Sequence, residues 1–117
     1  ALAAALFNRV PALDQGSTHA VLTGPAIRHF SDLCPDAVAQ MGVALGLPPS
    51  QASQAQSIID HVQDIFRSVG VPDRLAGISG QDRASALEAS LFNFNADRNR
   101  ELGRHRDRLL AVLEEAS

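Results

Sequence analysis

The sequence predicts an all-α protein, a single domain of about six helical segments spanning residues 1–117. Apolar residues recur at the i, i+3, i+4 spacing of a helix, most regularly in residues 51–69. Glycine and proline punctuate these segments, and no segment has a convincing strand pattern. A chain of this length, with 45% apolar residues, can bury a core without metals or disulfides.

The first two helices are expected on either side of a loop at residues 8–16. The N-terminal helix, residues 1–7, places Leu2, Leu6 and Phe7 on its apolar face. Ser17 is a plausible N-cap for the second helix, whose apolar residues are Ala20, Val21, Ile27 and Phe30. Pro25 lies inside that segment, so either the helix kinks or two short helices meet there.

Two further helices follow, the second of them long and amphipathic. Pro35 suits the first turn of a helix over residues 35–45, with Val38, Met41, Ala44 and Leu45 inward. Gly46 closes that helix, and the next runs from Gln51 to Val69. Its apolar face holds Ala55, Ile58, Ile59, Val62, Ile65, Phe66 and Val69. Gly70 suits the left-handed residue that ends a helix, and Pro72 prevents a restart.

The C-terminal third predicts two helices around an irregular polar stretch. Ser79 can cap a helix over residues 81–93, with Asp82 favoured near its start. The inward residues are expected to be Ala84, Leu87, Leu91 and Phe92. Residues 93–103 are rich in Asn, Asp and Arg, and the last helix, residues 104–115, places Leu109, Val112, Leu113 and Ala116 on one side.

Charge and composition exclude several classes of function. The net charge of −3 and the absence of Trp and Tyr argue against a nucleic-acid partner. No apolar run approaches the roughly 20 residues that span a bilayer, so we expect no membrane partner. Cys34 is the only cysteine, which excludes an internal disulfide and favours a cytoplasmic location. We expect it to be a half-buried structural thiol.

The only cluster with a chemical character is Asp14, Gln15 and His19. Gln15 and His19 lie four residues apart and would share a helix face. In one interpretation they line a cleft, where His19 is the weak catalytic candidate that contacts substrate or transfers a proton. In the other they form a polar helix start, capped by Asp14 or Ser17.

The remaining polar residues are interpreted as structural. His29, His61 and His105 fall on three different helices, and their spacing does not require them to converge on a metal. Asp60 and Asp64 belong to the polar face of the long helix, which is ordinarily solvated. Residues 95–101 only faintly resemble a calcium loop, without its central glycine or its closing distance.

Four segments, in order, resemble one known family. They are residues 15–22 (Gln-Gly-Ser-Thr-His-Ala-Val-Leu), residues 25–30 (Pro-Ala-Ile-Arg-His-Phe), residues 37–46, and Val-Gly-Val-Pro-x-x-Leu at residues 69–75 followed by Asp82 and Phe94-Asn95. Together they are similar to the C-terminal helical domain of the iron-dependent (group III) alcohol dehydrogenase superfamily, with maleylacetate reductase the nearest subfamily. The resemblance covers nearly the whole chain and implies the helical domain of a dehydroquinate-synthase-like fold.

The resemblance implies a parent enzyme of two domains with a cleft between them. Such an enzyme binds NAD(P) on an N-terminal nucleotide-binding domain and holds Fe or Zn in the cleft through an Asp and three His. This chain departs from that pattern, because Gln15 occupies the position of one metal-ligand His and the opening residues contain no histidine. Gln is a poor ligand compared with imidazole. We therefore expect no metal or cofactor in this chain and no activity from it alone.

Two functions remain open on these grounds. The first is the substrate-side and metal-side helical domain of an NAD(P)-dependent oxidoreductase, a fragment that lacks its nucleotide-binding partner. In that case the helix faces with Leu2, Leu6, Val21 and Leu22 would be exposed and would drive homo-oligomerisation. The second is a stand-alone, non-catalytic helical module that binds a partner protein or a small ligand.

Overall fold

The chain is all-helical in the computed structural model, which describes residues 1–93 and 97–117. The helices are α1 (Leu2–Phe7), α2 (Gln15–Phe30), α3 (Pro35–Ala44), α4 (Ala55–Ser68), α5 (Gly80–Leu91) and α6 (Arg106–Ala116). Two short 3-10 turns, η1 (Ser31–Leu33) and η2 (Leu102–His105), join them. These described ranges contain no strand, so the predicted fold class is confirmed at the level of an all-α chain with six helices.

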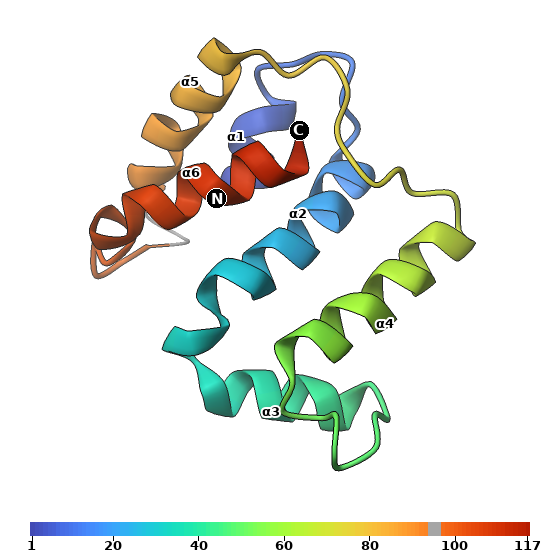
Figure 1. Cartoon of the computed structure of the whole chain (residues 1–117). Coiled ribbons are helices and arrows are strands. Elements are labelled where there is room, and N and C mark those ends of the chain that lie inside the picture. Colours follow the sequence, from blue (N-terminus) through green and yellow to red (C-terminus); the bar gives the residue numbers. More distant parts are fainter. Residues whose placement is uncertain (94–96) are drawn as a thin grey trace.

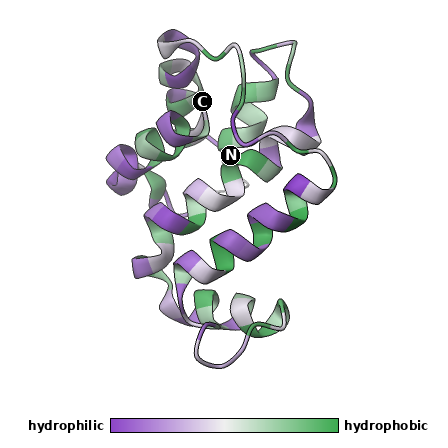
Figure 2. Cartoon of the chain, turned by 45° about the vertical axis from the view of Figure 1, so that its right-hand side comes forward, coloured by the Kyte–Doolittle hydropathy of each residue, from purple (hydrophilic) through white to green (hydrophobic). Residues whose placement is uncertain are grey.

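Helix α2 is the centre of the molecule and packs against α1, α4 and α6 (Figure 1). Helix α5 packs on α1 and α6, whereas α3 contacts α4 and η1. The main core is formed by α1, α2, α5, α6 and Leu75. Ile58 and Ile59 of α4 are fully buried outside that cluster, and Ile59 faces Gly24 of α2. Hydrophobic and hydrophilic stripes alternate along α4, as its sequence predicts (Figure 2).

Several helix ends follow the sequence signals that predicted them. Ser79 and Asp82 form a reciprocal capping box at the start of α5. Pro35 occupies the first turn of α3. Gly46 and Gly70 follow their helices with φ of 73° and 85°, the left-handed region that glycine adopts without strain.

The start of α2 differs from the expectation. Asp14, and not Ser17, is the N-cap, because the Asp14 carboxylate accepts a hydrogen bond from the Ser17 backbone N–H at 2.8 Å. The helix therefore begins at Gln15, two residues before the predicted cap. It also continues as one α-helix through Pro25, so it does not divide into two.

The start of α4 was also predicted too early. Residues 51–53 form turns, in which the backbone N–H groups of Gln51 and Ala52 both donate to the Pro48 carbonyl, at 2.8 and 2.9 Å. Helix α4 begins only at Ala55. The helix cannot extend back through these turns, because the backbone of Gln54 is extended (φ −93°, ψ 111°) and acts as the N-cap.

Several predicted inward positions are wrong. Met41, Ala44, Ile65, Val69, Ala84 and Phe92 are exposed, with Phe92 75% accessible. On α3 the packed position is Gly42, whose missing side chain lets the Ala52 carbonyl approach the backbone. On α5 the buried residues are Ala86, Leu87 and Ser90, so Leu87 is the predicted inward residue that the structure confirms as buried.

Two further expectations are corrected. Leu6, Val21 and Leu22 are each at most 6% exposed within the main core, so they do not form a free apolar face. Cys34 is exposed, and its Sγ lies 3.4 Å from the Phe30 carbonyl oxygen. The predicted resemblance at Phe94-Asn95, and residues 95–96 of the calcium-like stretch, lie outside the described residues.

Candidate functional site

An open groove runs beside α2, where α1, η2 and α6 approach it. Its volume is about 380 Å³. The lining is mostly apolar and consists of Ala1, Leu2, Ala3, His19, Leu22, Thr23, Ala26, Phe30, Leu102, Leu109 and Val112. Concave, mainly apolar pockets of this size with a few polar groups are typical small-molecule sites.

His19 is the polar residue at one end of the groove. It is exposed, and its Nδ1 lies 2.8 Å from the Gln15 carbonyl oxygen. A carbonyl oxygen only accepts hydrogen bonds, so Nδ1 carries the hydrogen and Nε2 of the neutral ring is an acceptor. Among the described residues, Nε2 has no partner. The Phe7 ring lies 6.3 Å from the imidazole, centroid to centroid.

Phe30 defines the other end of the groove. Its ring meets His105 edge to face, at a centroid distance of 5.9 Å. Leu102 of η2 is positioned by Asp97, whose carboxylate accepts hydrogen bonds from the backbone N–H groups of Glu101 and Leu102, at 2.7 and 3.1 Å. This buried carboxylate therefore has a structural role, which agrees with the prediction for the polar stretch.

The predicted cluster Asp14, Gln15 and His19 is brought together, but as a helix start. Asp14 caps α2, and its bonds with Ser17 hold the pKa of the carboxyl below its ordinary value of 3.8. Gln15 is exposed at the first position of the helix. The helix-start interpretation is confirmed for Asp14. Of the three, only His19 lines the groove, and its contact with a substrate stays a prediction.

The other histidines do not converge. His29 pairs with Glu115, His105 meets the Phe30 ring edge to face, and His61 lies half-buried on α4. In the part of the chain that the structure describes, no group of three or more His, Cys, Asp or Glu side chains is placed to hold a metal ion. Gln15 and His19 offer one amide and one imidazole, a donor set that does not fit the Fe or Zn site of the resembled family.

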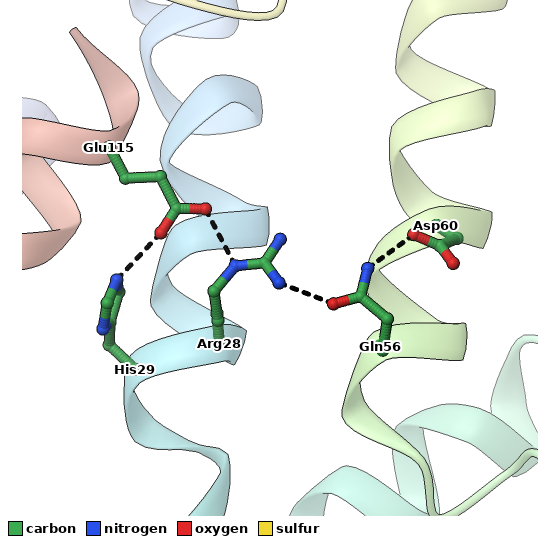
Figure 3. A network of polar contacts seen from close by, with 5 residues as sticks. All are labelled: Arg28, His29, Gln56, Asp60 and Glu115. Atoms are coloured by element: carbon green, nitrogen blue, oxygen red, sulfur yellow. Dashed lines mark hydrogen bonds and ion pairs between the residues drawn. The ribbon is translucent and has the colours of Figure 1, made fainter.

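A polar network beside the groove joins three helices (Figure 3). Glu115 of α6 accepts from Arg28 Nε at 2.9 Å and pairs with His29 Nε2 at 2.8 Å. Arg28 also donates to Gln56 of α4 at 2.5 Å, and Gln56 donates to Asp60 at 2.7 Å. The network holds α2 against α6 and α4, and within it Asp60 accepts a hydrogen bond from Gln56.

A second set of polar contacts, made by Arg108, joins α6 to η1. Arg108 donates to Asp32 at 2.8 Å and to the His29 carbonyl at 2.6 Å. The hydrogen bonds from Arg108 lower the pKa of Asp32. Asp64, the other predicted acidic residue of α4, pairs with Arg67 at 3.3 Å. These arginines are engaged in structural pairs and leave the groove without a guanidinium group among its lining residues.

No family model, no curated protein and no solved structure matches this chain. Within the described residues, no helix combines the length and apolar character needed to cross a membrane.

Sequence reasoning identified His19 but missed the groove itself. Leu102, Leu109 and Val112 meet α2 only in the folded chain, more than 80 positions after His19. The local pattern of Leu109 and Val112 predicts only core packing, and Leu102 falls in a stretch expected to be polar and irregular. The one local signal was His19, which lies next to the apolar residues Ala20, Val21 and Leu22.

Proposed function

We propose that this chain works by binding: the groove beside α2 takes an apolar ligand, and the chain itself supplies no catalytic centre. The observation that carries this proposal is the groove's composition, an apolar trough of about 380 Å³ with a single imidazole at one end. Burial of apolar ligand surface would supply the affinity, at roughly 25 cal/mol per Å² before the costs of association.

The wider role we propose is the substrate-side wall of an NAD(P)-dependent oxidoreductase similar to the iron-dependent alcohol dehydrogenases. Support comes from residues 15–22, one of the four segments that carry the resemblance, because two of its members, His19 and Leu22, line the groove. In this role the nucleotide-binding domain of the parent protein would bring NAD(P) to the ligand, and the dehydroquinate-synthase-like helical fold would be that of the resembled family.

The metal of that family finds no matching donor set here, so we derive no step through Fe or Zn. The nucleotide would bind to the partner domain, because no arginine lines the groove to pair with a diphosphate. What this chain contributes is the shape and the apolar surface that hold a ligand.

A stand-alone binding module is the second candidate, and one observation favours it. Leu6, Val21 and Leu22, which an enzyme fragment was expected to expose, are buried within this chain. The core is therefore formed without a second domain. Oligomerisation through exposed apolar residues would then involve other positions, such as Val43 and Val69.

Binding is tested by titrating the chain with the neutral fluorescent probe N-phenyl-1-naphthylamine. We expect Ala26→Phe, which fills the groove, to weaken binding at least tenfold. Ala84→Phe places the same ring at an exposed site on α5 and should leave binding unchanged. Absence of probe binding, or equal loss in both variants, would contradict the proposal.

The oxidoreductase role is tested separately on the native gene product, isolated from its source cells. We expect an intact mass well above the 12.4 kDa of this chain, together with enhancement of NAD(P)H fluorescence on binding. A product of 12.4 kDa that leaves the fluorescence unchanged would reject the enzyme role and favour the stand-alone module.

A further inference from the structure

We infer that the groove selects an elongated, uncharged apolar ligand that carries a hydrogen-bond donor, an N–H or O–H group, at the end held by His19. This inference rests on the proposed binding role of the groove and adds the class of ligand. It follows from the length of the groove and from the hydrogen-bonding state of two side chains.

The length of the groove follows from the positions of two of its lining residues on α2. His19 and Phe30 both line the groove and lie eleven residues apart on one continuous helix. At a rise of 1.5 Å per residue, they are separated by about 16 Å along the helix axis. A volume of about 380 Å³ spread over that distance is long and narrow. A rod-shaped or chain-like ligand therefore fits better than a compact one.

The hydrogen-bonding character of the ligand's head group follows from His19 and Thr23. The Nδ1 hydrogen of His19 is committed to the Gln15 carbonyl, which leaves Nε2 of the neutral ring with only a lone pair to offer. The Thr23 hydroxyl donates to the His19 carbonyl at 2.9 Å, so it too has only acceptor capacity left. Both polar side chains at this end are acceptors.

A donor head on the ligand complements these acceptors, whereas a carbonyl, ether or carboxylate head faces lone pairs. The nearby arginines do not change this conclusion. Arg28 is engaged by Glu115 and Gln56, and Arg108 is engaged by Asp32 and the His29 carbonyl.

The test uses three rod-shaped probes that differ only in the head group: 4-phenylphenol, its methyl ether 4-methoxybiphenyl, and biphenyl-4-carboxylate. Affinities are measured by equilibrium dialysis near neutral pH, where imidazoles are mainly uncharged. The chain has no Trp or Tyr, so probe fluorescence can be read with little protein background. We expect 4-phenylphenol to bind about fivefold more tightly than its methyl ether, and the carboxylate to bind most weakly.

His19→Phe keeps a planar ring but removes the imidazole acceptor, so it should reduce the preference for 4-phenylphenol to the part that Thr23 supplies, while both neutral probes still bind. His61→Phe, the same change on α4 outside the groove, should retain the full preference. Equal binding of the two neutral probes to the native chain, tighter binding of the carboxylate, or a preference that His19→Phe leaves undiminished would overturn the inference. Failure of every probe to bind would instead reject the proposed function of the groove.

Discussion

Arg28 Nε donates to the Glu115 carboxylate at 2.9 Å, although the two residues lie 87 positions apart in the sequence. The contact joins α2 to the last turn of α6, and the same carboxylate pairs with His29 (Figure 3). Helices α2 and α6, which the ion pair joins, also form two walls of the groove.

Glu115→Ala should lower the free energy of unfolding by roughly 0.5 kcal/mol, since the side chains of Arg28 and Glu115 remain 40% and 30% exposed and water screens the pair. Urea denaturation checks this value. Glu114→Ala is the matched control, because Glu114 is exposed and the described residues provide it with no ion pair. An equal effect of both changes would show that the ion pair between Arg28 and Glu115 adds nothing to stability.

Gly42→Ala should destabilise the fold by about 1–3 kcal/mol or more. A Cβ at this position would lie 1.9 Å from the Ala52 carbonyl oxygen, a backbone atom that cannot move without displacing the turn before α4. Gly103→Ala is the control, because no atom of the described residues, apart from its chain neighbours, lies within 4 Å of the added Cβ, and it should be neutral or slightly stabilising. A native melting temperature for Gly42→Ala would show that α3 does not pack against this turn.

Stability should fall in acid through the carboxyl groups of Asp14, Asp32 and Asp82. Hydrogen bonds with Ser17, Arg108 and Ser79, respectively, lower the pKa of each below its ordinary value of 3.8. A folded pKa below the unfolded value gives stability that is fully present above the unfolded pKa and is lost as pH falls through the folded pKa.

Melting temperatures measured from pH 6 down to about pH 2 check this dependence, with the decline expected below about pH 4. Asp14→Asn keeps a capping oxygen but does not titrate, so its melting temperature should fall less steeply over the same range. A variant curve parallel to that of the native chain would mean that the Asp14 cap does not contribute to the acid sensitivity.

Helix number and most helix ends were predictable because their signals are local. Ser79 with Asp82, Pro35, and Gly70 each act within one turn of chain, and the structure confirms all three. The cap of α2 was left open between Asp14 and Ser17, because both offer a good capping side chain three residues apart, and the structure selects Asp14.

The inward faces of the shorter helices were less predictable, because they depend on neighbours that are distant in sequence. Met41 was expected to face inward with Val38, but Val38 is buried and Met41 is exposed, because Gly42 is the position at which the Ala52 carbonyl approaches α3. Likewise, local pattern pointed to His19, but the groove forms only when Leu109 and Val112 of α6 meet α2.

The most direct test of the central claim is to locate where an apolar ligand binds. Methyl NMR spectra of the chain, labelled at Leu, Val and Ile, can be followed during titration with N-phenyl-1-naphthylamine. The account predicts shifts concentrated at Leu22, Leu109 and Val112, with Val43 and Ile65 unchanged. Shifts concentrated instead at Val43 and Ile65, the exposed residues of α3 and α4, would contradict it and place binding on the opposite side of α2.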